Sequence, residues 1–398
     1  MFAREIRSGV LYVGTVDWHR PVFDELIPLP QGTSYNAYLV KGATHTALID
    51  TVDPSREAEF LKGLESLAPL RIDFIIPNHA EQDHSGAIPA VLARHPEAKV
   101  VTNAKCKDIL KDLLLLPEEA FKVVQDRETL PLGGRTLEFI LAPWVHWPET
   151  MFTYLREDRI LFSCDFLGAH YASSRLFTGR DPAVQLAAKR YYAEIMMPFR
   201  TSIRKHLDLL KGFPIDLVAP SHGLVYTDPA FILDAYARWA SDEVANEALI
   251  LYVSMHGSVQ RMVDHLADGL IRREVVVTPY HLPRADLGEL AMDLVDAASV
   301  VLASPVFHAG LHPEADYGLT LVAGLRPKTR FFGLLGSYSW GHRLEEIVKN
   351  RLTGLKAEIL PPVISKGHPK EADFKALDGL ADTIGRKHRD LGLISRGQ

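Results

Sequence analysis

A run of nine residues, Asn78 to Gly86, constrains this chain more than any other feature. It reads Asn-His-Ala-Glu-Gln-Asp-His-Ser-Gly and places two imidazoles and two carboxylates within six residues. The apolar run 74–77 before it predicts a buried strand, and the segment 87–94 after it has a helical pattern. Four such side chains at the mouth of a buried strand would repel one another or lose hydration without a compensating positive charge. The run therefore predicts a metal site.

The spacing within this run also predicts how its side chains point. In an extended segment, alternate residues share one face, so His79, Glu81 and Asp83 would point the same way. His84 would begin the turn and reach a neighbouring ion. The run can thus supply ligands to more than one metal.

Three later segments carry a ligand-type residue in a similar setting. His146 stands between Trp144 and Trp147, Asp165 ends an apolar run, and His222 follows another apolar run. Taken singly, such a histidine can be a packed, hydrogen-bonded residue, and such an aspartate can be a turn or helix cap. Taken together with the first run, they indicate a metal site with ligands from several strand ends.

Composition limits the classes of protein to consider. A chain of 398 residues favours two domains, and 47% hydrophobic with 24% charged residues is typical of a soluble globular protein. No segment reaches the roughly 18 apolar residues of a membrane span, and the N-terminus lacks a signal-peptide pattern. A net charge of −6 argues against nucleic acid as a main partner. Only two cysteines, Cys106 and Cys164, are present, which excludes a disulfide framework and favours the cytoplasm.

Strand and helix patterns divide the chain into two α/β domains. In the N-terminal half, strand-like runs come first and helical stretches at about 56–66 and 105–116 follow, which predicts a β sandwich flanked by helices. From about residue 247, five strand-like runs alternate with helical segments, which predicts a doubly wound parallel sheet with its ligand crevice at the carboxyl ends of the strands. We expect domains at 1–246 and 247–398.

The order of the ligand-type residues resembles the metallo-β-lactamase superfamily, whose fold is an αββα sandwich. The hydrolases of that superfamily usually carry a histidine where this chain has Glu81. Three carboxylates beside four imidazoles form a harder, more anionic ligand set, which suits iron better than zinc. With a flavodoxin-like domain after it, the chain resembles the flavodiiron proteins over essentially its whole length. The matching segments are 32–39, 79–86, 143–151 and 162–165.

The resemblance implies a set of metal ligands. One iron would be held by His79, Glu81 and His146, the other by Asp83, His84 and His222, with Asp165 bridging the two. Tyr192 and His170 also match the family and are candidates to donate hydrogen bonds to bound oxygen species. A packed aromatic and a surface imidazole remain the alternatives for these two residues.

The second domain carries three loops at the positions where a flavodoxin binds FMN. The first loop is Ser254, Met255, His256, Gly257, Ser258 and Val259. The second is Ser304, Pro305, Val306, Phe307, His308, Ala309 and Gly310. The third is Ser337, Tyr338, Ser339 and Trp340. The first loop precedes a helix and suits a phosphate, and Phe307 and Trp340 can shield a flavin ring.

Several residues depart from the usual flavin-binding pattern. Val259 and Val306 each replace a common Thr, Ser339 stands where Gly is frequent, and His308 and His342 are unusual. The loss of two hydroxyls would weaken FMN binding by about 1 kcal/mol each if each made one net hydrogen bond. We expect FMN to bind; the alternative is a flavin-free flavodoxin fold.

The resemblance implies a cytoplasmic flavodiiron reductase. A reduced protein donor, such as rubredoxin, would pass electrons through FMN to a non-haem diiron site that reduces O2 to water or NO to N2O. No CxxC pair is present, so the donor would be a separate protein. The family implies a head-to-tail homodimer or a dimer of dimers. The alternatives are a dinuclear metallohydrolase and a flavodoxin-type electron carrier, and the sequence does not choose between O2 and NO.

Overall fold

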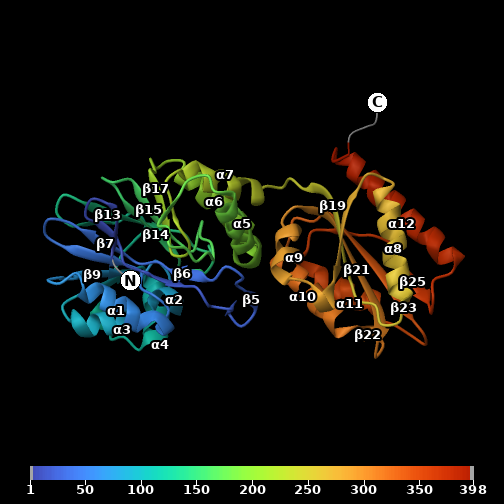
Figure 1. Cartoon of the computed structure of the whole chain (residues 1–398), viewed down its shortest axis with the longest axis horizontal. Helices are drawn as coiled ribbons and strands as arrows, with labels where there is room; N and C mark the ends of the chain where they lie inside the picture. The colour runs from blue at the N-terminus through green and yellow to red at the C-terminus, as the bar shows by residue number, and fades with distance from the viewer. Residues whose placement is uncertain (1–2, 395–398) are drawn as a thin grey trace. The chain divides into compact units, whose positions relative to one another are not determined.

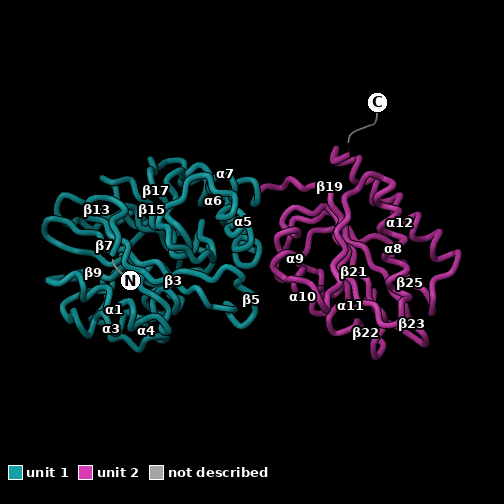
Figure 2. Tube along the Cα trace, in the orientation of Figure 1, with its two compact units in different colours: residues 1–240 teal, residues 241–398 magenta. Residues whose placement is uncertain are grey.

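The computed structural model describes residues 3–394, and the chain forms two compact units, 1–240 and 241–398 (Figure 2). The division falls before the strand β19 (Ala245–Tyr252), close to the boundary at 246 and 247 that the strand pattern predicts. None of the helices within residues 3–394 combines the length and apolar character that a membrane crossing requires.

Two seven-stranded sheets form the centre of the first unit. The first sheet has the order β1 (Arg4–Arg7), β2 (Val10–Tyr12), β7 (Tyr38–Lys41), β8 (Thr46–Ile49), β9 (Phe74–Ile76), β10 (Lys99–Thr102) and β11 (Phe121–Val123). The second has the order β12 (Thr129–Pro131), β13 (Thr136–Leu141), β14 (Met151–Leu155), β15 (Ile160–Cys164), β17 (Leu217–Pro220), β18 (Val225–Tyr226) and β16 (Phe177–Thr178). Two short pairs, β3 (Thr15–Asp17) with β6 (Thr33–Tyr35) and β4 (Val22–Phe23) with β5 (Ile27–Pro28), stand apart.

Helices cover the outer faces of both sheets, so the first unit is an αββα sandwich (Figure 1). The first sheet is covered by α1 (Glu57–Glu65), α3 (Ile88–Arg94) and α4 (Ala104–Leu114). The other side carries α5 (Pro182–Tyr191), α6 (Arg200–Leu210) and α7 (Pro229–Trp239). One apolar core lies between the sheets, where Val40 and Ile76 of the first meet Phe139 and Phe162 of the second. Burial of both sheet faces explains the apolar runs in the sequence.

The second unit is a doubly wound sheet. Its strands lie in the order β20 (Val276–His281), β19, β21 (Ala297–Phe307), β23 (Phe331–Tyr338) and β24 (Glu358–Ile359), with β25 (Val363–Lys366) continuing along β23 and β22 (Gly310–Leu311) pairing with β21. All pairs except β21–β22 are parallel. This order corresponds to 2-1-3-4-5, the flavodoxin arrangement.

Helices cover both faces of this sheet as well (Figure 1). On one side lie α8 (Ser258–Ile271) and α12 (Glu371–Asp390). On the other lie α9 (Leu287–Leu294), α10 (Pro313–Leu325) and α11 (Leu344–Arg351). The fifth strand differs from the expected run at 357–360, because Pro361 and Pro362 lack the N–H of a ladder bond and divide it into β24 and β25.

Single-turn segments complete the described elements. They are η1 (Pro54–Arg56), α2 (Gln82–Ser85), η2 (Glu118–Ala120), the π-helical turn η3 (Tyr192–Met196), η4 (Met197–Phe199), η5 (Leu282–Arg284) and η6 (Leu352–Gly354). Of these, α2 carries part of the site described below.

Candidate metal centre and flavin edge

The run that opens the site turns earlier than the alternation pattern predicts. Glu81 has φ −58° and ψ 142° and caps α2, so Asp83 and His84 lie on a helical turn rather than in an extended segment. The expectation that His79, Glu81 and Asp83 share one face is therefore wrong. The turn instead separates the run into two halves, and His79 and Glu81 face one group of ligands while Asp83 and His84 face another.

The other ligand candidates stand directly after strands of the second sheet. Asp165 follows β15, where Cys164 adopts φ 53° and turns the chain, and His222 follows β17. Gly223 has φ 84°, and a Cβ there would lie 2.8 Å from the Ala169 carbonyl oxygen, so only glycine fits after His222. His146 lies in the loop between β13 and β14. Two sheets thus present ligand-type residues to one space.

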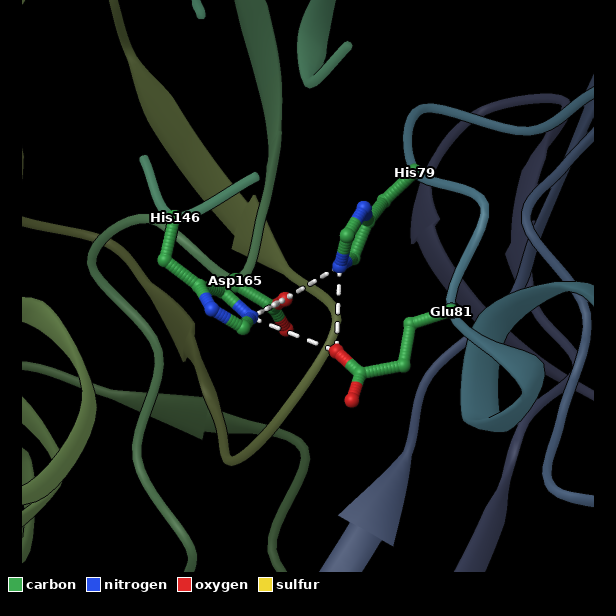
Figure 3. A group of neighbouring side chains, drawn as sticks. All are labelled: His79, Glu81, His146 and Asp165. Atoms are coloured by element: carbon green, nitrogen blue, oxygen red, sulfur yellow. Dashed lines mark hydrogen bonds and ion pairs between the residues drawn. The ribbon is translucent and has the colours of Figure 1, made fainter. Parts of the chain in front are cut away.

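The first group consists of His79, Glu81, His146 and Asp165 (Figure 3). Glu81 Oε2 lies 3.0 Å from His79 Nε2 and 3.2 Å from His146 Nε2. Asp165 Oδ2 lies 3.6 Å from His79 Nε2 and 3.3 Å from His146 Nε2. Each residue offers a ligand atom within 4.8 Å of the others, a spacing that can surround one cation.

The second group consists of Asp83, His84 and His222, and the other oxygen of Asp165 faces it. Asp165 Oδ1 lies 2.9 Å from His84 Nε2 and 3.3 Å from His222 Nε2. The two oxygens of Asp83 lie 3.3 Å from His84 Nε2 and 3.1 Å from His222 Nε2. One oxygen of Asp165 is therefore directed to each group, which is the geometry of a carboxylate between two ions.

Several of these atoms approach one another without hydrogen-bond geometry. Both oxygens of Asp83, both ring nitrogens of His84 and Oδ1 of Asp165 are buried and make no hydrogen bond within the described part of the chain. Buried polar atoms in native structures almost always have a partner. Three carboxylates and four imidazoles directed at common points thus fit a pair of cations, and the donor set fits iron.

The carboxylates and imidazoles of this pocket shift one another's pKa values. Burial opposes the ionisation of Asp165, but the surrounding imidazoles, His84 first, outweigh it and hold its pKa well below the ordinary value. Burial likewise opposes protonation of the histidines. The close approach of the Asp165 and Glu81 carboxylates nonetheless raises the pKa of His146 to about 9, and that of the Asp165 and Asp83 carboxylates raises the pKa of His222 to about 10.

Two buried groups that sequence reasoning missed hold the ligands in place. Glu149 Oε1 lies 2.6 Å from His79 Nδ1 and accepts from the Ala80 N–H at 3.1 Å. The Ser34 carbonyl oxygen lies 2.7 Å from His222 Nδ1. Both contacts occupy Nδ1 and leave Nε2 for the centre of the site. In the sequence, Glu149 follows a proline in a loop, and no motif marks it as the partner of His79.

A third missed group joins the two sheets beneath the site. Asp50 accepts from the Asn78 N–H at 2.7 Å and from the Ser221 hydroxyl at 3.1 Å, so it connects the residues before His79 and before His222. Burial raises the pKa of this carboxyl. The only sequence signal for this role of Asp50 is its position directly after the apolar run of β8.

The two residues expected beside the ligands differ in position. His170 is buried with its ring 4.8 Å from that of His222, and its Nδ1 lies 2.9 Å from the Thr33 hydroxyl. Tyr192 instead packs on Tyr236 and Trp239, with ring centroids 5.3 and 5.5 Å away.

The neighbouring Tyr191 is the tyrosine that lies at the site. Its ring lies 4.8 Å from that of His170 and 5.8 Å from that of His222. Burial, and then the negative charge of Asp165, raise its pKa well above the usual range. The two tyrosines are adjacent in the sequence, so the family pattern alone does not separate them.

The expected flavin loops of the second unit lie at the carboxyl ends of β19, β21 and β23, which are parallel and end at the same edge. The second and third loops begin earlier than the structure has them, because Ser304–Phe307 still belong to β21 and Ser337 and Tyr338 to β23. Gly257 has φ 84° before the 14-residue helix α8, and a Cβ placed there would meet nothing within 4 Å. Phe307 and Trp340 are 40% and 76% exposed. An open turn at a helix N-terminus with two uncovered aromatic rings fits a phosphate and a planar ring.

Other residues of these loops serve the fold. Val259 is only 1% exposed and packs in the core beneath α8. The Ser304 hydroxyl donates to the Pro305 carbonyl and accepts from the His312 N–H. His342 Nδ1 is buried and makes no hydrogen bond within residues 3–394, while Ser337 donates to the Gly367 carbonyl oxygen. The loops therefore combine structural and solvent-facing groups.

The fold and the site define a class: a metallo-β-lactamase-like domain with a two-group metal pocket, joined to a flavodoxin-like domain. A family model described as "ODP family beta lactamase" matches residues 33–223. The chain is 35% identical over 366 residues to a nitric oxide reductase of Moorella thermoacetica, covering 89% of this chain and 90% of that one. It is 30% identical to the rubredoxin-oxygen oxidoreductase of Megalodesulfovibrio gigas, covering 97% and 98%.

Solved structures that resemble this chain come from the same kind of protein. Rubredoxin oxygen:oxidoreductase from Desulfovibrio gigas superposes with a TM-score of 0.93 at 29% identity, covering 98% of this chain and 99% of that one. The flavodiiron protein from Giardia intestinalis gives 0.90 at 28%, covering 98% and 97%. The chain belongs to the flavodiiron protein family.

Proposed function

We propose that this chain is a flavodiiron reductase that uses electrons from a reduced protein donor to reduce O2 to water, NO to N2O, or both. The observation that carries the proposal is the position of Asp165, whose two oxygens face two separate ligand groups in one buried pocket. Relatives named as a nitric oxide reductase and as a rubredoxin-oxygen oxidoreductase support both substrates.

The proposed ligand assignment follows the two groups. His79, Glu81 and His146 would hold one iron and Asp83, His84 and His222 the other, and Asp165 would offer one oxygen to each. Residues 1–246 would form this diiron domain and residues 247–398 the FMN-binding domain. The three loops of the second unit, with Phe307 and Trp340 as the exposed rings, would hold FMN.

When bound, FMN can exchange one or two electrons, and the iron pair can bind and polarise a small molecule. The protein residues contribute orientation and exclusion of water. Glu149 and the Ser34 carbonyl fix His79 and His222 with Nε2 inward. His170 and Tyr191 are buried beside them and could donate hydrogen bonds to a small molecule held in this pocket.

The proposal includes partners and location. The electron donor would be a rubredoxin-like or other reduced protein. We also propose a cytoplasmic, head-to-tail homodimer or a dimer of dimers, in which the flavin of one chain serves the irons of the other.

Subunit exchange tests the dimer. One full-length variant carries His79→Ala with Asp165→Ala, and the other has a disrupted Ser254–Ser258 loop. Each should be inactive alone, and mixing should restore part of the activity in heterodimers. A lack of restored activity, with exchange verified by mass, would show that electrons travel within one chain.

Anaerobic turnover tests the function. The full chain with a reduced rubredoxin is given O2 or NO, and consumption of each is recorded with the same preparation. The proposal predicts consumption of at least one gas and its loss in Asp165→Ala. A preparation that consumes neither gas but hydrolyses esters or thioesters would instead be the dinuclear metallohydrolase.

A further inference from the structure

The loop that follows β25 meets the first flavin loop, although neither the family pattern nor the strand pattern points to it. β19, β23 and β25 are parallel, and Ser337 of β23 is in register with Ser365 of β25. Their carboxyl ends therefore lie at one edge of the sheet. This places the loop 366–370 beside the N-terminus of α8.

One imidazole of this loop contacts the first flavin loop directly. His368 Nδ1 lies 3.1 Å from the hydroxyl of Ser258, the first residue of α8. If Ser258 donates to Nδ1, the neutral ring carries its proton on Nε2, and the protonated ring carries one there as well. The His368 side chain is exposed, so it presents an N–H donor close to the helix N-terminus.

The backbone of this loop is fixed by its own hydrogen bonds. The Gly367 N–H donates to the Tyr338 carbonyl at 2.8 Å, and the Ser337 hydroxyl donates to the Gly367 carbonyl at 2.9 Å. The Ser365 hydroxyl lies 3.2 Å from the His368 carbonyl oxygen. Gly367 has φ 74°, which suits glycine. A donor on such a loop loses little conformational entropy when it binds a ligand.

The charged groups of Lys370 in this loop and of Asp373 in the first turn of α12 bond to other partners. The Asp373 carboxylate accepts from the Lys370 N–H at 2.8 Å and from the Ser365 hydroxyl, so it caps α12. The Lys370 ammonium donates to the Lys366 carbonyl oxygen at 2.8 Å. Neither group forms a hydrogen bond with His368.

The first flavin loop itself lacks one donor. Val259 occupies the position where a threonine is common, and it is buried in the core. The Ser254 hydroxyl accepts from the Gln260 N–H at 3.2 Å. A phosphate at this turn would keep the first N–H groups of α8 but would have one hydroxyl fewer.

We propose that His368 binds the phosphate group of FMN and sets the preference of this chain for FMN over riboflavin. The inference rests on the proposed function, which places FMN at this edge. His368 supplies through Nε2–H the donor that Val259 does not. The two flavins share a ring and differ in the phosphate, so a phosphate ligand distinguishes them.

The experiment is a titration of the full chain, freed of flavin, with FMN and separately with riboflavin, followed by quenching of flavin fluorescence. His368→Ala should weaken FMN binding by about tenfold, the effect of one hydrogen bond to a charged group, and leave riboflavin binding within about twofold. His368→Gln, which keeps an N–H donor, should retain part of the FMN affinity.

A matched control removes another imidazole from the same region. His265 lies on α8 and bonds Asp378 at 2.9 Å, so His265→Ala should change neither affinity. Equal weakening of both flavins in His368→Ala, or an unchanged FMN affinity, would overturn the inference while leaving the proposed function intact. A wild-type chain that binds neither flavin would contradict the proposed function as well.

Discussion

The metal pocket of the first unit and the flavin edge of the second differ in how they are built. In the pocket, side chains from two sheets converge, and Asp83, Asp165 and His222 are at most 4% exposed. At the edge, the loops are open, and Met255 and Trp340 are 43% and 76% exposed. A metal requires particular side-chain atoms at fixed distances, whereas a flavin can be held by backbone groups and rings. The residue types in a sequence therefore reveal a metal site, whereas they reveal little of a flavin site that is held by backbone groups.

Asp165→Ala is the change with the largest expected effect. Because each carboxylate oxygen faces a different ligand group, we expect loss of both irons together, measured as iron per chain, while FMN is retained. His84→Ala should mainly lower occupancy of one ion. A full complement of iron in Asp165→Ala would contradict the bridging role.

The second unit also has a buried histidine, His388, which can be compared with the buried histidines of the metal pocket. His388 lies in the core between the Ser299 hydroxyl and Asn246 Oδ1, each 2.8 Å away, and burial lowers its pKa to about 4. The unfolded chain binds this proton near pH 6.5, so stability should fall as pH drops from about 6.5 to 4, by about 3 kcal/mol.

The measurement is denaturant unfolding of the second unit, followed in the full chain at several pH values. His388→Asn should be less stable at neutral pH and should lack most of this pH dependence. An equal slope in wild type and variant would show that His388 does not remain neutral in the fold.

Glu149→Gln tests how firmly the pocket is preorganised. The amide cannot accept from His79 and Ala80 as strongly, so iron affinity should fall by about 10- to 100-fold without loss of the fold. Competition with an iron chelator measures this affinity. Glu138→Gln is the control, because this buried carboxylate pairs with Arg127 and Arg156 instead. A similar loss of iron in both variants would mean a general effect of buried charge.

The smallest expected effects concern the two valines of the flavin loops. Val306→Thr should tighten FMN binding by about 1 kcal/mol, the contribution of one hydrogen bond. Val259→Thr should gain less, because its side chain packs in the core and a hydroxyl there loses hydration. Unchanged FMN affinity in both variants would mean that backbone donors already satisfy the cofactor.

The same contrast explains what the sequence could predict. The strands and helices followed from apolar runs and helical spacing, and seven ligand-type residues were recognisable because they follow strands in one order. Glu149 and Asp50 were not, since a buried carboxylate that orients another residue has no spacing rule of its own. Tyr191 could not be separated from Tyr192 without knowing which side of the chain faces the pocket where α5 passes into η3.

In the second unit, β25 and the loop with His368 were missed for a physical reason. Pro361 and Pro362 interrupt the apolar run, so the pattern ends at 360 although the chain rejoins β23 at Val363. The contact between His368 and Ser258 joins residues 110 positions apart. Only the parallel order of the strands brings them together.

Metal and flavin content of the freshly purified full-length chain tests the central claim most directly. The claim is that the first unit holds a pair of irons around Asp165 and the second holds FMN. We expect about two irons and one FMN per chain, measured by elemental analysis and by the flavin absorption spectrum. Zinc in place of iron without flavin, or FMN without any metal, would contradict the account.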